Sequence, residues 1–337
     1  REAQRLRPLD DASRGRELTR PEVVTPPERR PWKRYVALGD SLTEGLCDTS
    51  RMADGQYRGW ADRLSTMLAQ GRGAFEYANL AVRSRRVRDL VNEQAPQALA
   101  LKPDLVSIFM GANDLVTHSA DPFRLATHVE KVVRDIRGSG ADVLLVTPFL
   151  PDRPAARIFQ RRFALYATEP RRIAAATDSY LMDAAALPAL RDRTMYADDM
   201  VHLSSRGHRY LAYRAAEALG IPDAEALGRL DDALHGFDPV DDPVPQGDWL
   251  RTHALPWVWR RMRGRTAGDG LLAKHADYIL IPGGNAARRS TARRSSARVS
   301  KHPAASAGPA DTRLPTAAGR WASSARARLS SRHSAAR

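Results

Sequence analysis

The sequence predicts an α/β fold in which a doubly wound parallel sheet carries helices on both faces. Short runs of apolar, β-branched and aromatic residues alternate with longer helix-like runs along the middle of the 337-residue chain. Glycine, asparagine, aspartate or proline follows each short run, as expected where a buried strand ends. Repeated alternation of this kind indicates strand–helix–strand units, which build a parallel sheet.

Four strands are predicted from runs that are too short for helices. They lie at residues 34–38 (RYVAL), 75–80 (FEYANL), 105–110 (LVSIFM) and 143–147 (VLLVT). Helices are predicted at residues 60–70, 87–100, 122–137 and 205–219. Ser204 is positioned to cap the last helix, and Gly220 follows its end. Such a sheet places its ligand crevice at the carboxyl ends of the strands.

The formal net charge of +14 is concentrated at the two ends of the chain. Residues 283–337 contain 12 Lys or Arg and one acidic residue, and residues 1–33 contain 9 basic and 6 acidic residues. Residues 34–282 therefore carry no net charge, so nucleic acid is not an expected partner of the folded body. For the basic tail, an electrostatic tether to nucleic acid or anionic lipid is the alternative to a passenger segment.

Composition and patterning divide the chain into four segments. They are a charged, disordered N-terminal segment (1–33), a folded α/β domain (34–222), a C-terminal helical appendage (223–282) and a basic, disordered tail (283–337). Within the appendage, apolar residues recur at helical spacing over residues 248–263. We expect a helix packed on the body there, and a peripheral contact with a lipid surface is the alternative.

Cysteine usage and hydropathy bound the remaining possibilities. Cys47 is the single cysteine, so neither an intramolecular disulfide nor a Cys-based zinc site is expected. No apolar run is long enough for a transmembrane helix, and residues 1–33 lack the apolar stretch of a signal peptide, so the expected location is cytoplasmic. Nothing in the sequence indicates the oligomeric state.

Three polar clusters lie where the sheet would form its ligand crevice. They are Gly39-Asp40-Ser41-Leu42, Gly111-Ala112-Asn113-Asp114 and Asp199-Met200-Val201-His202. A serine hydroxyl is a weak nucleophile at neutral pH, so Ser41 needs a base, and the imidazole of His202, with an ordinary pKa of about 6.5, suits that role. Asp199 would hold the imidazole in one tautomer. The amide of Asn113 and the backbone N–H of Ser41 would meet the oxyanion that forms when an ester carbonyl is attacked.

These clusters resemble the first, third and fifth signature blocks of the SGNH hydrolase superfamily, also called GDSL esterases and lipases. Residues 79–84 (NLAVRS) are similar to the second block, and Ser84 stands where the family usually has a glycine whose backbone N–H joins the oxyanion hole. A serine keeps that donor but disfavours a positive φ. The resemblance covers residues 34–222, and phrases such as YVALGDSLTEG and HLSSRGHRYLA are similar to actinobacterial members.

The resemblance implies a three-layer α/β/α sandwich of the flavodoxin-like kind. It implies a serine hydrolase that cleaves small-molecule carboxylic esters through an acyl-enzyme on Ser41, without a cofactor or metal. The alternatives are a carbohydrate acetylesterase or thioesterase of the same family, and a catalytically weakened binding protein on this scaffold. The α/β-hydrolase fold is disfavoured because its G-x-S-x-G turn would need a glycine where this chain has Thr43.

Further residues beside these clusters are predicted to support or extend the site. Supporting positions are Gly39, Asp40, Gly111 and Asp114. An arginine run follows the second block, at Arg83, Arg85, Arg86 and Arg88. We expect this run to face water at the start of a helix, and recognition of an anionic substrate is the alternative.

Overall fold

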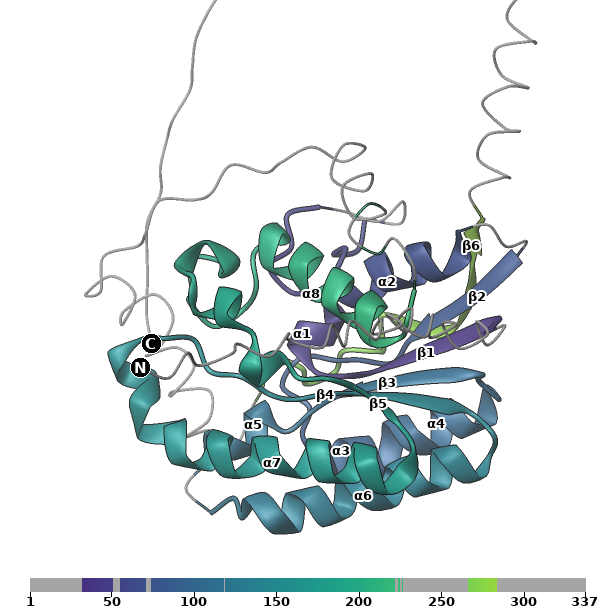
Figure 1. Ribbon diagram of the computed structural model, residues 1–337. Coiled ribbons are helices and arrows are strands. Elements are labelled where there is room, and N and C mark those ends of the chain that lie inside the picture. The colour runs from purple at the N-terminus through teal and green to yellow at the C-terminus, as the bar shows by residue number, and fades with distance from the viewer. Residues whose placement is uncertain are drawn as a thin grey trace, which may run out of the picture. The chain divides into compact units, whose positions relative to one another are not determined.

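The computed structural model of the chain describes residues 32–50, 55–70, 74–117, 119–221, 224, 226 and 266–283 (Figure 1). Several predicted features lie outside these ranges. They are most of the charged N-terminal segment, the helix expected at 248–263 and the basic tail beyond residue 283.

Among the described residues, six strands form one sheet in the order β5-β4-β3-β1-β2-β6 (Figure 1). The strands are β1 (Arg34–Gly39), β2 (Ala74–Asn79), β3 (Leu105–Phe109), β4 (Asp142–Val146), β5 (Tyr180–Met182) and β6 (His275–Pro282). The first five strands are parallel, and β6 pairs antiparallel with β2. The four strands predicted from sequence are confirmed to within one residue at each end.

Helices cover both faces of the sheet, which confirms the α/β/α sandwich (Figure 1). One face carries α1 (Ser41–Glu44), α2 (Trp60–Ala69) and α8 (Ser205–Ala218). The other carries α3 (Val87–Asp89), α4 (Ala95–Ala100), α6 (Pro122–Gly138) and α7 (Gln160–Thr177), and the short α5 (Ala112–Leu115) follows β3. Short 3₁₀ helices occupy residues 154–159, 184–186, 188–191 and 193–195. Successive side chains of a strand point to opposite faces of the sheet, so β1 contributes to the apolar core on each face. Tyr35 and Ala37 face α2 and α8, while Val36 and Leu38 face the opposite layer.

The helix predicted at residues 87–100 forms, but it contains a wide π turn at residues 90–94. Pro96 lies two residues after the turn, and because it has no N–H it cannot donate to the ordinary helical hydrogen-bond ladder. Gln94 ends this turn. Its side-chain amide bonds both the backbone N–H and the carbonyl of Gly39, at 3.0 and 2.8 Å. The irregular turn therefore ties this helical segment to the end of β1.

The prediction of a helical appendage is wrong at residues 275–282, which form β6 instead. Ile279 lies opposite Tyr77 of β2, and Pro282 ends the strand at the edge of the sheet. A proline is tolerated at an edge because one side of the strand needs no partner. The predicted parallel sheet thus gains an antiparallel edge, which was missed because its partner strand lies far away in the sequence.

The ordered domain also begins earlier than predicted. Trp32, placed in the disordered segment, is buried, and its indole N–H donates to Asp142 Oδ2 at 2.8 Å. Its ring contacts Tyr180 of β5 edge to face. Neither β5 nor α7 was predicted, since β5 is three residues long and Pro170 interrupts the helical pattern of α7.

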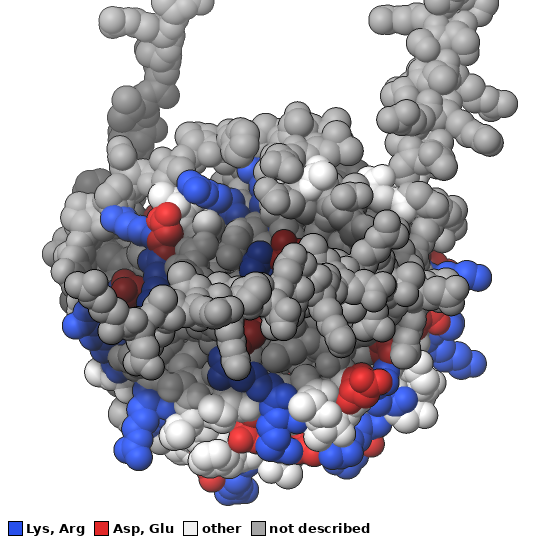
Figure 2. All heavy atoms as spheres, in the orientation of Figure 1, with Lys and Arg blue, Asp and Glu red and all other residues white. Residues whose placement is uncertain are grey.

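Charged side chains of both signs are interspersed over the described part of the face in Figure 2. On α6, for example, Arg134 pairs with Glu130 and Lys131 pairs with Asp135. This distribution agrees with the zero net charge of residues 34–282. Within the described ranges, no helix is both long and apolar enough to cross a bilayer.

Candidate active site

Ser41 lies directly beyond the carboxyl end of β1, as the first residue of α1. Asp40 caps this short helix, and its Oδ1 accepts the backbone N–H of Leu42 at 3.1 Å. Gly39 makes the tight turn sterically allowed, because a Cβ there would lie 2.8 Å from the carbonyl oxygen of Phe109. Residues 39–41 therefore position the predicted nucleophile at the carboxyl end of β1.

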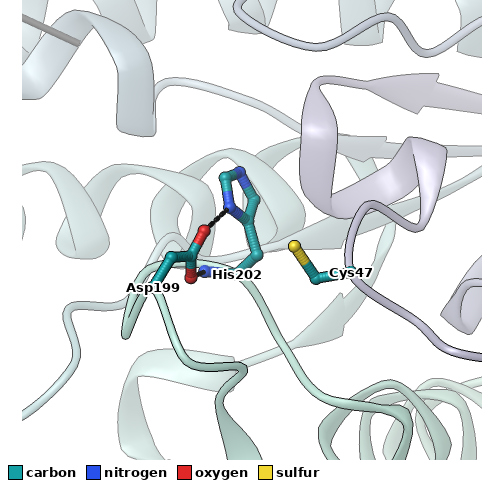
Figure 3. Close-up of side chains that lie close together, drawn as sticks. All are labelled: Cys47, Asp199 and His202. Atoms are coloured by element: carbon teal, nitrogen blue, oxygen red, sulfur yellow. Dashed lines mark hydrogen bonds and ion pairs between the residues drawn. The ribbon is translucent and has the colours of Figure 1, made fainter. Parts of the chain in front are cut away.

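His202 and Asp199 reach Ser41 from the loop that precedes α8. The imidazole Nε2 lies 2.9 Å from Ser41 Oγ, and Nδ1 lies 2.5 Å from Asp199 Oδ2 (Figure 3 shows the latter pair). Asp199 Oδ1 accepts the backbone N–H groups of Val201 and His202, each at 2.9 Å. Met200 turns the loop with a φ of +53°. The three predicted residues thus form one continuous hydrogen-bond chain, the arrangement that activates a serine nucleophile.

The electrostatics of this pair favour a charged carboxylate beside a charged imidazole. Burial works against ionisation of Asp199, but hydrogen bonds from His202 and from backbone N–H groups outweigh it and hold the pKa of the carboxyl well below its usual range. Burial also lowers the pKa of His202, but Asp199 and the thiol of Cys47 outweigh it and raise that pKa above its ordinary value. This charge state is the one that forms when the imidazole takes a proton from serine.

Two of the predicted oxyanion donors are backbone groups. Within the part of the chain that the structure describes, no hydrogen bond uses the N–H of Ser41 or that of Ser84. Ser84 has a φ of +67°, in the left-handed region that its glycine counterpart would enter freely. The serine therefore adopts the positive φ that was expected to disfavour it, at a conformational cost of about 1 kcal/mol.

The third predicted donor, Asn113, is already hydrogen bonded. Its Nδ2 donates to Asp40 Oδ2 at 2.9 Å and to the carbonyl of Arg85 at 3.1 Å. Both hydrogens of the amide are thus engaged, so an oxyanion would have to replace one of these acceptors. Asp40 is buried, and burial is the main cause that raises its pKa to about 6.

The remaining supporting residues shape the loops around Asn113. Gly111 has a φ of +115°, and a Cβ there would lie 3.0 Å from the ring of Tyr166. Asp114 Oδ2 accepts the backbone N–H of Val87 at 3.1 Å, which ties α5, the short helix after β3, to the start of α3. Gly111 and Asp114 therefore hold α5 and the turn that precedes it.

The arginine run is paired with carboxylates of the chain itself. The ion pairs are Arg83–Glu44, Arg85–Glu93 and Arg88–Asp89. Arg86 lies near Asp114, whose charge it favours. Because these acids compensate the positive charge, the run gives no support to recognition of an anionic substrate.

Cys47 and Gln94 contact the site and were not predicted. Figure 3 shows the sulfur of Cys47 facing the imidazole and carboxylate, and ligand atoms of Cys47, Asp199 and His202 lie within 4.8 Å of one another. Gln94 acts on Gly39 through the π turn described above. For Cys47 the available signal was its position six residues after Ser41, in the turn that leaves α1. No comparable signal marks Gln94, which lies between the second and third blocks.

Comparison with known proteins places these residues in a family. Residues 37–210, just over half of the chain, match the model of the GDSL-like Lipase/Acylhydrolase family. An acetylxylan esterase from Geobacillus stearothermophilus is 28% identical over 155 residues, which cover 42% of this chain and 71% of that protein.

Among solved structures, the acetylxylan esterase Axe2 from the same bacterium aligns with a TM-score of 0.47 and 22% identity, over 56% of this chain and 94% of that one. LAE5, an α/β hydrolase enzyme from the metagenome of Lake Arreo, has a TM-score of 0.47 and 22% identity, over 56% and 95%. The family match spans all five residues of the candidate site, Ser41, Ser84, Asn113, Asp199 and His202. The chain therefore belongs to the GDSL-like lipase/acylhydrolase family of ester hydrolases.

Proposed function

We propose that this ester hydrolase works through an acyl-enzyme on Ser41, with His202 as the base and Asp199 as the group that orients it. The observation that carries the proposal is the hydrogen-bond chain from Ser41 Oγ to His202 Nε2, at 2.9 Å, and from His202 Nδ1 to Asp199 Oδ2, at 2.5 Å. The first distance is within reach of direct proton transfer, and the second holds the imidazole with Nε2 turned toward the serine.

In the first half of the reaction, Ser41 Oγ bonds to the ester carbonyl carbon while its proton passes to His202 Nε2. The carbonyl oxygen becomes an oxyanion, which the N–H groups of Ser41 and Ser84 stabilise. Asn113 contributes a third N–H by exchanging the carbonyl of Arg85 for the oxyanion. The bond to the alcohol oxygen then breaks, and the imidazolium gives its proton to the departing alcohol.

The second half reverses the roles. Water attacks the acyl carbon, gives a proton to His202 Nε2 and forms a second tetrahedral intermediate. When that intermediate collapses, Ser41 Oγ leaves with the proton and the carboxylic acid is released. Asp199 stays ionised throughout, consistent with its lowered pKa, and stabilises the transient imidazolium.

A fluorophosphonate probe tests this assignment, because it phosphonylates an activated serine. We expect a single labelled peptide that contains Ser41, no labelling in Ser41→Ala and much slower labelling in His202→Ala. Thermal unfolding of each variant would show that the fold is retained. A folded wild-type chain that leaves Ser41 unlabelled would contradict the proposal and would favour a binding protein on a hydrolase scaffold.

For the substrate, we propose an acetyl ester of a carbohydrate. The support is the similarity to an acetylxylan esterase over 155 residues, which cover 71% of that protein. A panel of soluble esters graded by acyl length, together with acetylated xylo-oligosaccharides, tests this. We expect kcat/KM to be highest for acetyl esters and acetate to be released from the oligosaccharides. A rate that rises steadily with acyl length would indicate a lipase-like substrate instead.

A further inference from the structure

The thiol of Cys47 faces the Asp199–His202 pair from a turn that is held firmly in place (Figure 3). The residue before it, Leu46, donates its N–H to the carbonyl of Ser41 at 3.0 Å and accepts from His208 Nε2 at 3.3 Å. Cys47 itself has a φ of +69°, a strained value that persists because the turn around it is constrained.

The residue after it is equally constrained. Asp48 is fully buried, and its Oδ2 bonds Arg63 Nη2 at 3.0 Å. Its Oδ1 accepts the hydroxyl of Ser205, the first residue of α8, and the backbone N–H of Ser50. The backbone of Cys47 is thus fixed on both sides, in a position from which the thiol faces the site.

Thiolate, imidazole and carboxylate are the three side-chain donors that zinc accepts. Donor atoms on one tetrahedral zinc lie roughly 3 to 4 Å apart, as follows from bonds of about 2.0 to 2.3 Å. The three donors here already lie within 4.8 Å of one another, so small side-chain movements bring them into that range. A Cys-based zinc site was not expected because the chain has a single cysteine. The fold brings His202 and Asp199 beside that cysteine, and these residues supply the other two ligands.

We propose that Zn²⁺ binds to Cys47, Asp199 and His202 and that the bound ion reversibly switches the hydrolase off. The inhibitory consequence rests on the proposed function of this site, whereas the binding does not. If zinc takes His202 Nε2, the lone pair that accepts the proton of Ser41 is lost. If it takes Nδ1, the hydrogen bond that Nδ1–H donates to Asp199 is lost. Either way the base no longer serves the nucleophile.

Binding is tested with Co²⁺ on the full-length, reduced chain, because cobalt reports its ligands by absorption. A thiolate ligand produces a sulfur-to-cobalt charge-transfer band in the near ultraviolet. Since Cys47 is the single cysteine of the chain, such a band can come from no other residue. We expect the band to saturate at one Co²⁺ per chain, to disappear when Zn²⁺ is added and to be absent from Cys47→Ser.

Inhibition is tested on a soluble acetyl ester in buffers of known free Zn²⁺. We expect wild-type activity to fall to near zero and to recover when a chelator is added. Inhibition of Cys47→Ser is measured relative to its own rate without Zn²⁺, because the thiol contacts the catalytic pair. Its half-inhibitory Zn²⁺ should rise by at least about 10-fold, since even residues that merely contact a zinc ligand contribute 10- to 100-fold to affinity. Mg²⁺ at the same concentrations should have no effect, because it prefers oxygen ligands in an octahedral shell.

The outcomes separate the two proposals. Absence of the charge-transfer band, or equal Zn²⁺ sensitivity of wild type and Cys47→Ser, would overturn the metal site. A chain that binds Co²⁺ through its thiolate but hydrolyses no ester would support the metal site and overturn the proposed function.

Discussion

His202 and His208 lie six residues apart and both neighbour an aspartate, yet their environments give them opposite properties. His202 is partly exposed, and its two nitrogens bond Ser41 and Asp199. His208 is fully buried, and its Nε2 donates to the carbonyl of Leu46 at 3.3 Å. The pKa of His202 is raised, whereas burial lowers the pKa of His208 to about 4.

The difference lies in whether the aspartate bonds the imidazole directly and so offsets the effect of burial. Asp199 directs one carboxylate oxygen at the imidazole, so its charge acts on His202. Asp48, beside His208, bonds Arg63 and Ser205, and Arg63 also opposes protonation of His208. Burial is the main cause that lowers the pKa of His208, and the charge of Asp48 opposes it without outweighing it. A carboxylate therefore makes a buried histidine basic only when its attraction, strengthened at His202 by a direct hydrogen bond, exceeds the cost of burial. The first pair is suited to catalysis and the second to stability.

The largest expected effect separates the two histidines directly. His202→Ala should lower kcat by about 10⁴-fold or more, because the serine loses its base, with little change in thermal stability. His208→Ala should instead destabilise the fold by about 2 to 4 kcal/mol through the cavity it leaves. Steady-state kinetics normalised to the concentration of folded protein, together with thermal unfolding, measure both. Comparable loss of kcat per folded molecule in the two variants would remove the distinction.

Asn113→Ala tests whether the catalytic cluster includes a side-chain oxyanion donor. Loss of one such donor typically lowers kcat by about 100-fold or more, with a smaller effect on KM, because the bond strengthens as charge develops. Kinetics per titrated site, with unfolding measured alongside, give the answer. If kcat falls less than about threefold, far below that penalty, then the amide serves only to connect Asp40 with the carbonyl of Arg85.

The buried histidine should make the fold sensitive to acid. Because the folded pKa of His208 is about 4, below the ordinary 6.5, its contribution is fully present above pH 6.5 and is lost as the pH falls toward 4. Between about pH 7 and pH 5 the free energy of unfolding should decrease by roughly 2 kcal/mol from this group. Denaturant unfolding of wild type and His208→Gln at both pH values isolates it. Identical losses in both proteins would assign the acid sensitivity elsewhere.

The catalytic histidine should be visible in the pH dependence of activity. His202 must be neutral to accept the proton of Ser41, and its pKa is raised in the fold, so the acid limb of kcat/KM should have its midpoint above pH 6.5. Asp199→Asn removes a main cause of the increase and should move the midpoint to lower pH, besides lowering the rate. A wild-type midpoint at or below pH 6.5 would contradict the raised pKa.

The smallest effect concerns backbone strain in the catalytic cluster. Ser84→Gly should stabilise the fold by up to about 1 kcal/mol, because glycine adopts the φ of +67° without steric cost. The backbone N–H is unchanged, so kcat should stay close to wild type. Denaturant unfolding checks the expected gain in stability, and steady-state kinetics check the unchanged kcat. A stabilised variant with a large loss of kcat would show that the serine side chain itself takes part.

Features that depend on local sequence could be predicted without a structure. The four strands were recognisable because each is a short apolar run followed by a turn residue. Ser41, with Gly39 and Asp40, and the Asp199–His202 pair were recognisable because each occupies a few consecutive positions next to a predicted element. Even the strained position of Ser84 followed from a six-residue block.

Tertiary structure decided the features that depend on contacts between distant segments. β6 was assigned to a helical appendage because this segment becomes a strand only through its hydrogen bonds with β2, which is distant in the sequence. No sequence motif indicates the hydrogen bonds between Gln94 and Gly39, or the one that Asn113 donates to the carbonyl of Arg85. The position of Cys47 beside His202 likewise depends on two loops that meet at the end of the sheet. Such contacts are set by packing of the whole domain, which local propensity and spacing do not encode.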